Sequence, residues 1–560
     1  MKIIKSTTRK IRILLIVLGI SFLSISTFSF VNDDFEIAKN LDIFATLYRE
    51  LNLNYVDEVS PGELMKKAID AMLESLDPYT NYYSESEIEE YTMMTTGEYG
   101  GIGAYIHKNG DYVFVSDPYE GCPAQKNDLR AGDVILEVNG KSAKGKSTSD
   151  VSAMLKGQPG TTITLLIKRE GEQKNIEKTI TREEIKMPNI PYSGMVDPDI
   201  GYINLSGFTK NASTEVKDAF LKLKSQQELK GLIFDLRGNG GGLLNEAVNI
   251  VNLFVEKGQV VVKTKGKIKD QNNVHVTLNP PVDLNIPIVI LVDRGSASAS
   301  EIVTGAIQDL DRGVIMGERT YGKGLVQNVV PLSYNTKLKV TVAKYYIPSG
   351  RCIQAIDYTH RNEDGSVGKV PDSLKTAFKT KNGRVVYDGG GIEPDIASEP
   401  YEYSDISACL ISKYLIFDFA TQYKMKHPEI AKAKDFEVPD DLFNEFVAYL
   451  NDKEYDYTTE SERNLKELKE SAEKEKYFDD FKVEYEALKN KMMHNKKADL
   501  IKFKTEIKEL LKEEIVSRYY FQRGRIEVAL QSDELVKKAI EVLKDNNRYK
   551  SLLISNANKK

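Results

Sequence analysis

Cysteine and histidine are scarce in this sequence, and the few that occur stand far apart. The three cysteines, Cys122, Cys352 and Cys409, form no CxxC pair, so the sequence indicates neither a zinc site nor a disulfide framework. The five histidines are scattered singly, and no HExxH pattern of a metalloprotease is present. We therefore expect no metal and no cofactor.

An excess of basic residues is also missing. Lys and Arg number 77 against 83 Asp and Glu, which gives a net charge of -6. A nucleic-acid-binding protein normally carries a basic surplus, so we expect no nucleic-acid partner. With 41% hydrophobic and 29% charged residues, the composition is that of a globular protein, and 560 residues correspond to roughly three or four domains.

The N-terminus has the pattern of an export signal. Basic residues up to Arg12 precede an uncharged, mostly apolar run over residues 13–31. The run is about long enough to cross a bilayer, and no clear small-x-small cleavage site interrupts residues 24–30. We predict an uncleaved anchor that holds the protein at the inner membrane, with the rest in the periplasm or another extracytoplasmic space. A cleaved signal peptide is the alternative.

Along the rest of the chain the pattern of apolar residues and glycines changes three times. Apolar residues first recur at helical spacing, then short β-type runs are broken by glycine, and then strands and helices alternate. Beyond Pro400 only Gly524 remains among the glycines, and Lys/Glu-rich helical patterns take over. These changes predict, after the segment 1–31, an N-terminal helical segment (32–91), a β-domain (92–183), an α/β domain (184–400) and a helical C-terminal domain (401–560).

A serine lies where a buried strand of the α/β domain turns into a helix. The apolar run 286–292 is typical of a strand buried on both faces, and the small residues that follow include Ser296, Ser298 and Ser300. Such a turn exposes a nucleophile at the top of a sheet and points N–H groups at it. The alternative is that these serines only cap the helix, with Glu301 placed to complement the macrodipole.

A lysine between two glycines supplies a candidate base. Lys323 stands between Gly322 and Gly324, and no histidine lies in or beside this segment or the serine turn. A lysine removed from water can be neutral near physiological pH and accept the proton of a serine hydroxyl. Gln327, four residues later, could hydrogen-bond the amine and orient it.

A third glycine-rich turn could hold an oxyanion. Residues 234–242 follow another apolar run, and their glycines allow main-chain N–H groups to face a developing negative charge. Such a turn can equally hold a phosphate, but neither GxGxxG with a later ribose-binding acid nor GxxxxGK[ST] is present.

The three segments 235–242, 295–302 and 321–327 resemble, in order and spacing, the signatures of the carboxy-terminal processing peptidases, family S41. The resemblance implies a ClpP/crotonase-like α/β core with an inserted PDZ domain. It implies that Ser298 is the nucleophile, Lys323 the general base and Gln327 the residue that orients it. The oxyanion hole would be the main-chain N–H of Ala299 with that of Gly240 or Gly241, between which the sequence does not choose.

The β-domain resembles the PDZ domain of these enzymes. Its glycine loop, with Gly100, Gly101, Ile102 and Gly103, feeds a strand, and residues 124–140 carry a second PDZ-like run. N–H groups of such a loop can hold a terminal carboxylate while the strand edge pairs with the peptide. The partners expected are proteins or peptides with free, apolar C-termini, and a plain structural β-domain is the alternative.

The sequence therefore predicts an exported serine endopeptidase that binds substrate C-termini and works through a Ser298/Lys323 dyad. In the family a basic residue after the PDZ helix helps to signal occupancy, and Lys156 is the candidate here. One alternative is a catalytically silent PDZ scaffold, which would have no need of Ser298, Lys323 and Gln327 together. An acyl-CoA enzyme of the crotonase kind would leave the PDZ domain idle. The sequence leaves a homo-oligomer open and does not explain residues 401–560.

Overall fold

The computed structural model describes residues 34–362, 364–492 and 496–555, and the chain divides into two units, up to Tyr82 and from Tyr83 onward. The first unit contains a helix over residues 34–54 and helix α2 (Pro61–Glu74), as the helical spacing predicts. Pro61 occupies the first turn of α2, where its missing N–H breaks no helical bond. The predicted membrane anchor, residues 13–31, lies outside the described residues, and within these no helix is long and apolar enough to cross a membrane.

The second unit begins with the end of strand β1 (Asn81–Tyr83) and helix α3 (Ile88–Thr96), which leads into the β-domain that resembles a PDZ domain. The domain is an antiparallel sheet in the order β3-β4-β5-β7-β8. Val113, Ile135 and Leu165 belong to its buried core. Its elements are β3 (Ala104–Asn109), β4 (Tyr112–Pro118), α4 (Pro123–Lys126), β5 (Val134–Val138), β6 (Lys141–Ser142), α5 (Thr148–Leu155), β7 (Thr162–Lys168) and β8 (Ile176–Thr181), with β2 (Glu98–Gly101) paired to β9 (Glu183–Lys186) at the border to the next domain.

The α/β domain is built on a six-stranded sheet in the order β10-β11-β12-β15-β16-β23, in which only β10 is antiparallel to its neighbour. Side chains of a strand alternate between the two faces, so β12 points Phe234 to one face and Ile233 to the other. The elements are β10 (Tyr192–Asp197), β11 (Ile200–Asn204), α6 (Ala212–Gln226), β12 (Gly231–Asp235), α7 (Leu244–Asn252), β15 (Ile288–Val292), α8 (Ala299–Asp309), β16 (Val314–Gly317) and β23 (Ile396–Ala397).

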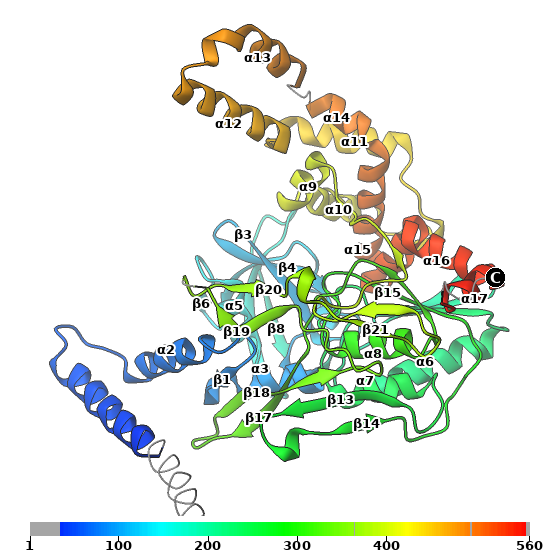
Figure 1. Ribbon diagram of the computed structural model, residues 1–560. Helices are drawn as coiled ribbons and strands as arrows, with labels where there is room; N and C mark the ends of the chain where they lie inside the picture. Colours follow the sequence, from blue (N-terminus) through cyan, green and yellow to red (C-terminus); the bar gives the residue numbers. More distant parts are fainter. Residues whose placement is uncertain (1–33, 363, 493–495, 556–560) are drawn as a thin grey trace, which may run out of the picture. The chain divides into compact units, whose positions relative to one another are not determined.

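Two different parts of the chain cover the two faces of this sheet. Helices α6, α7 and α8 pack on the face that carries Phe234. The opposite face is covered by α16 (Glu534–Lys544) and α17 (Asn546–Leu552), whose Val542 and Tyr549 share a core with Ile233 and Leu291. The last helices of the chain therefore complete the core of the α/β domain (Figure 1).

A second, antiparallel sheet borders the α/β domain. Strand β18 pairs with β17 over one part of its length and with β13 over another, and β13 pairs with β14. The bounds are β13 (Val260–Gly266), β14 (Val274–Val276), β17 (Leu325–Pro331) and β18 (Lys337–Tyr346), followed by two short hairpins, β19 (Ile356–Arg361) with β20 (Val367–Lys369) and β21 (Ala377–Lys379) with β22 (Val385–Tyr387).

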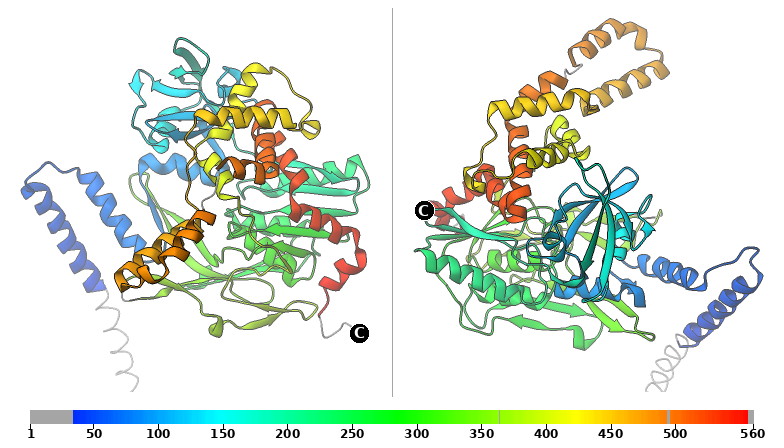
Figure 2. Two further views of the ribbon diagram at one scale, coloured as in Figure 1. Left: turned by 90° about the horizontal axis from the view of Figure 1, so that it is seen from above. Right: turned by 180° about the vertical axis from the view of Figure 1, so that it is seen from behind.

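The C-terminal domain is helical, as predicted. Its core contains Phe419, Phe443, Phe446 and Ile515. It comprises α9 (Asp405–Ser412), α10 (Leu415–Lys426), α11 (Asp440–Tyr449), α12 (Glu460–Glu475), α13 (Phe478–Met492), α14 (Lys496–Lys502) and α15 (Lys504–Ser532). Helices α12 and α13 extend from the rest of the domain as a hairpin (Figures 1 and 2), while α10 and α15 pack together next to the PDZ domain.

Candidate active site

The turn that carries the predicted nucleophile Ser298 (the nucleophile turn) lies between strand β15 and helix α8. Ser298 directly precedes α8 and has φ 57° and ψ -111°, an unusual conformation for a residue with a side chain. The two nearby serines attach this turn to the main chain after β12: Ser296 Oγ donates to Leu236 O at 2.8 Å, and Ser300 Oγ donates to Asn239 O at 2.8 Å. Ser296 and Ser300 are thus structural, which leaves Ser298 as the serine of this turn that faces the site.

Glu301 connects the nucleophile turn to the turn that carries Lys323 (the lysine turn). Its carboxylate is fully buried, and Oε2 accepts the N–H groups of Ser298 and Lys323, each at 2.9 Å. The other oxygen, Oε1, accepts the hydroxyl of Thr320 at 2.6 Å and the N–H of Gly322 at 2.7 Å. Burial raises the pKa of the Glu301 carboxyl, while these four donors act in the opposite direction because they stabilise the ionised form.

The lysine turn is held on its other side as well. The N–H of Gly324 donates to Gln354 Oε1 at 2.7 Å, so buried side chains accept the N–H groups of residues 322–324 in succession. Gly322 has φ 88°, and a Cβ there would lie 2.4 Å from the Cβ of Ala355. The two glycines around Lys323 are therefore required by positive φ and by close packing.

The structure distinguishes between Gly240 and Gly241, the two glycines that the sequence left open as donors of the oxyanion hole. The N–H of Gly241 donates to Asn239 Oδ1 at 2.9 Å, whereas none of the described hydrogen bonds is donated by Gly240 N or by Ala299 N. Gly241 instead allows its backbone to lie close to the backbone of Ala299, because a Cβ at residue 241 would lie 2.8 Å from Ala299 N. The geometry favours Gly240 and Ala299 as the available pair of donors.

One cavity of about 690 Å³ collects the predicted residues. Ser298, Ala299, Lys323 and Gln327 line it together with glycines 240–242. The side chain of Gln327 also donates to Thr341 Oγ1 at 3.1 Å, which fixes its amide on the wall of the cavity. Three segments that are separate in sequence, 240–242, 298–299 and 323–327, thus meet at one place.

Sequence reasoning missed several residues of the site. Tyr345 on β18 is buried, and its hydroxyl donates to the main-chain oxygen of Ser298 at 3.2 Å. Burial raises the pKa of Tyr345, so the hydroxyl stays protonated as a donor. Tyr91 and Met94 of α3 line the cavity, although they precede the PDZ domain in sequence. Of these residues only Glu301 stands out in the sequence, because it lies three residues after Ser298, and that position indicates a carboxylate that complements the helix macrodipole.

The glycine-rich turn over residues 234–242 also forms an ion pair with the C-terminal part of the chain. Arg237 forms ion pairs with Asp235 at 2.6 Å and with Asp533 at 2.7 Å, and Asp235 also accepts the hydroxyl of Tyr202 at 2.7 Å. Asp533 is at the same time the N-cap of α16, where it accepts the N–H groups of the first turn. The helix that covers the sheet therefore also holds the loop that leads to Gly240.

The glycine loop of the PDZ domain has the expected form. Its carbonyl groups are occupied, since Ile102 O accepts Ala124 N at 2.7 Å and Gly103 O accepts Tyr119 N at 3.0 Å. None of the described hydrogen bonds is donated by the N–H groups of Ile102 or Gly103. Gly103 has φ 73°, and a Cβ there would lie 2.5 Å from the Cβ of Cys122. The loop thus offers two adjacent N–H donors at the start of β3, the arrangement that can bind a carboxylate.

Lys156 directly follows helix α5, as the sequence predicts. Its Nζ lies 5.5 Å from the centre of the Tyr99 ring and 3.7 Å from Met93 Sδ on α3. It therefore joins the PDZ domain to the helix that lines the catalytic cavity. In the described part of the chain, no group of three or more Cys, His, Asp or Glu side chains could hold a metal ion.

The fold and the site are those of a serine peptidase that carries a PDZ domain, and comparisons with known proteins agree. Models described as "Peptidase family S41", "PDZ domain" and "Probable PDZ-protease, C-terminal helical domain" match residues 199–363, 114–169 and 406–543. A "Carboxy-terminal-processing protease" of Bartonella bacilliformis is 36% identical over 59% of this chain and 76% of the relative. The chain belongs to peptidase family S41 and is a carboxy-terminal processing protease.

Other similar proteins carry related descriptions. A "Probable CtpA-like serine protease" of Staphylococcus aureus is 37% identical over 56% of this chain, and the match spans 62% of that relative. Among solved structures, a photosystem II D1 C-terminal processing protease is 28% identical, with 64% of this chain and 92% of that chain covered and a TM-score of 0.33.

Proposed function

We propose that this protein is an exported, membrane-anchored endopeptidase that captures substrates by their C-termini and cleaves them with a Ser298/Lys323 dyad. The observation that carries the dyad is the shared carboxylate of Glu301. Because it binds the N–H of Ser298 and the N–H of Lys323 through one oxygen, it fixes the two turns relative to each other at the wall of one cavity. A scaffold that only binds peptides has no use for this link.

The chemistry follows from the groups at the cavity. Neutral Lys323 takes the proton of the Ser298 hydroxyl as Oγ attacks the carbonyl carbon of the substrate. The oxyanion that forms accepts hydrogen bonds from the N–H groups of Gly240 and Ala299. Protonated Lys323 then gives its proton to the leaving amine, which leaves an acyl-enzyme on Ser298, and Lys323 next activates the water that releases the acid.

Two substitutions test the dyad. Ser298→Ala should abolish casein cleavage, and Lys323→Arg should lower kcat by roughly three or more powers of ten, because arginine keeps the charge but does not give up its proton. Lys344→Arg is a matched control on the neighbouring strand β18, outside the residues that line the cavity. Near-normal hydrolysis by the Lys323→Arg enzyme would refute the role of this lysine as the base.

Capture by the PDZ domain is tested with a pair of peptides. The two N–H groups of the loop gain from a carboxylate but not from an amide, so a peptide with an apolar, free C-terminus should bind more tightly than its amidated twin. Capture raises the local concentration of the bound chain near Ser298 and hence the rate of cleavage below saturation. Equal cleavage rates for the two peptides would place substrate choice in the catalytic cavity instead.

Export and anchoring rest on residues 13–31. An apolar run behind a basic N-terminus supports export, which would leave the PDZ and catalytic domains outside the cytoplasm and the substrates among exported proteins.

A further inference from the structure

Strand β3 of the PDZ domain has a free edge. Among the strands that the structure describes, β3 pairs with β4 alone, and it directly follows the loop with the two available N–H groups. If the PDZ domain works as proposed above, the substrate tail pairs with this edge and places its terminal carboxylate at Ile102 and Gly103. The last residue of the tail then lies beside Ala104, and the residue before it lies beside Tyr105.

The two faces of β3 have different surroundings. Ala104 and Ile106 point towards the PDZ core, next to helix α5, and form the apolar side of the groove. Tyr105 and His107 point to the opposite face. Because side chains of a paired strand alternate in the same way, the last side chain of the tail enters the apolar side, and the penultimate one points to the face of Tyr105.

The C-terminal helical domain covers that opposite face. The rings of Tyr414 and Phe417 pack on Phe114 of β4, with centroids 5.2 and 5.1 Å apart from it. Between the domains lies a cavity of about 530 Å³, which Tyr105 and Asp117 line from the PDZ side. Tyr403, Glu513, Glu514 and Arg525 are among the residues that line it from the helical domain. The penultimate side chain of a bound tail is thus directed at a space with walls from two domains.

The charges on these walls are unequal. Glu514 is compensated, since it forms ion pairs with Arg518 at 2.8 Å and with Arg525 at 3.0 Å. Asp117 and Glu513 are half-buried, and the described hydrogen bonds and ion pairs include none for either carboxylate. Burial raises the pKa of Asp117 to about 6 and that of Glu513 to about 7, although the charge of the nearby Arg525 acts in the opposite direction on both carboxyls.

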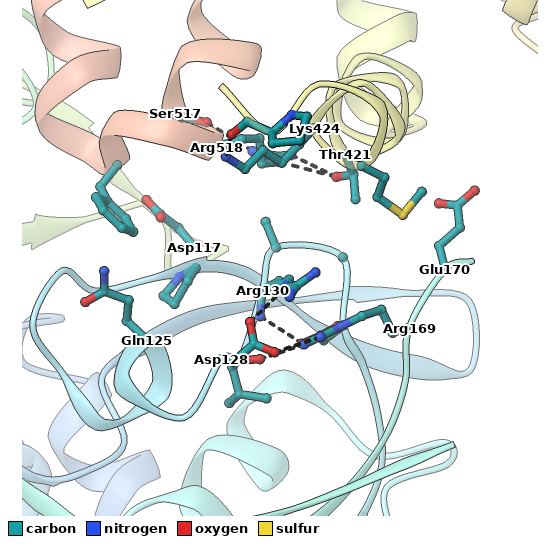
Figure 3. A pocket seen from close by; sticks show the side chains of 18 residues that line it. Asp117, Gln125, Asp128, Arg130, Arg169, Glu170, Thr421, Lys424, Ser517 and Arg518 are labelled. Carbon is teal, nitrogen blue, oxygen red and sulfur yellow. Dashed lines mark hydrogen bonds and ion pairs between the residues drawn. The ribbon is translucent and has the colours of Figure 1, made fainter. Parts of the chain in front are cut away.

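Asp117 lines two of the cavities between these two domains. It is the register partner of Tyr105 across β3 and β4, which puts the two side chains on the same face. It also borders a second cavity of about 470 Å³, where Figure 3 shows it on the PDZ side with Arg518 on the helical side. Arg518 is already bound to Glu514 and to Thr421 Oγ1, so it leaves the charge of Asp117 without a direct partner.

We propose that the helical domain and β3 together form a subsite for the penultimate residue of the captured tail, and that this subsite selects a lysine or arginine. A basic side chain can pair directly with Asp117 and Glu513, because Arg525 on the same wall is bound to Glu514, and its aliphatic stem can lie against the rings of Tyr105 and Tyr403. An acidic side chain at the same position meets two carboxylates. The helical domain thereby takes part in choosing substrates.

The test uses the full chain in detergent with Ser298→Ala, which binds tails without cutting them. Fluorescein-labelled decapeptides ending in Lys-Val, norleucine-Val or Glu-Val are compared by fluorescence anisotropy at pH 8. We expect the lysine peptide to bind about fivefold more tightly than the norleucine peptide, and the glutamate peptide to bind most weakly. Added Glu513→Gln or Asp117→Asn should reduce the preference for lysine to below about twofold. Glu527→Gln, in the part of α15 that follows the break at Phe521 and outside the cavity, should keep it.

Amidated twins of the three peptides separate this inference from the proposed function on which it rests. If free acids bind better than amides but the three penultimate residues bind equally, the subsite is refuted and PDZ capture stands. A preference for lysine that survives both Glu513→Gln and Asp117→Asn also refutes the subsite. If amides bind as well as acids, capture of the C-terminus itself is refuted. The acid-to-amide ratio in each variant also reports whether its PDZ domain is folded.

Discussion

Replacing Glu301 by Gln should disable the enzyme without removing either member of the dyad. The amide has nearly the same volume, but one oxygen becomes an NH2 group, which cannot accept hydrogen bonds. In one orientation the N–H groups of Ser298 and Lys323 lose their acceptor; in the other the Gly322 N–H loses its acceptor, while the Thr320 hydroxyl can turn and accept from the NH2 group. A buried donor without an acceptor costs about 1–3 kcal/mol, so the substitution should destabilise the α/β domain by at least that amount.

The effect on catalysis should exceed the effect on binding. In one orientation of the amide the two turns lose their common anchor, and in the other the turn that carries Lys323 loses the hydrogen bond of Gly322. A displacement of about 1 Å between reacting groups costs roughly a factor of one hundred in rate. We therefore expect kcat on a peptide substrate to fall at least that far while KM changes little. Glu393→Gln is the matched control, because Glu393 is exposed and pairs with Arg319 at the surface, where such a pair is worth about 0–1 kcal/mol.

Hydrogen exchange gives a second readout that a general loss of stability would not mimic. Exchange of the Gly322 and Lys323 amides, followed by mass spectrometry of a peptide over residues 320–325, should accelerate in Glu301→Gln more than exchange in α6, which lies away from these turns. If kcat, thermal stability and this exchange all stay within twofold of the Glu393→Gln control, the assignment of Glu301 as the link between the turns is wrong.

Three further predictions concern other parts of the chain. Burial raises the pKa of Asp117 to about 6 and of Glu513 to about 7 from the usual 3.8 and 4.5, so the folded protein binds more protons than the unfolded one between about pH 4 and 7. The unfolding temperature should therefore fall as pH rises through this window; the double variant Asp117→Asn/Glu513→Gln should show a shallower fall, and an unchanged slope would contradict the shifts. Deleting residues 533–560 should give insoluble protein in a solubility assay, because it uncovers the sheet, whereas replacing the hairpin 460–492 by a short linker should leave it soluble; equal solubility would refute the packing argument. If residues 13–31 are an uncleaved anchor, N-terminal sequencing of the membrane fraction should read the start of the chain, and a sequence that begins near residue 30 would indicate a cleaved signal.

Local sequence was sufficient for the architecture and for the identity of the chemical groups. The continuous apolar runs at 231–236 and 286–292 became central strands, because only strands buried on both faces can bury every side chain of such a run. The glycines around Lys323 and in 238–242 predicted turns that the structure places at one cavity. Ser298, Lys323 and Gln327 could therefore be named as candidates from the sequence, and the resemblance supplied the roles that stay predictions.

Contacts between distant segments could be decided only by the tertiary structure. The sequence pattern of α16 shows that one face of the helix is apolar, but such a face could pack on many different surfaces. The structure shows that it covers the sheet and that Asp533 binds Arg237. The roles of Gly240 and Glu301 depend on where individual N–H groups point, which follows from backbone orientation after folding and not from residue type. Hydrogen bonds are short and directional, whereas the hydrophobic effect is not, so the sequence pattern determines which faces are buried but not which donors meet which acceptors.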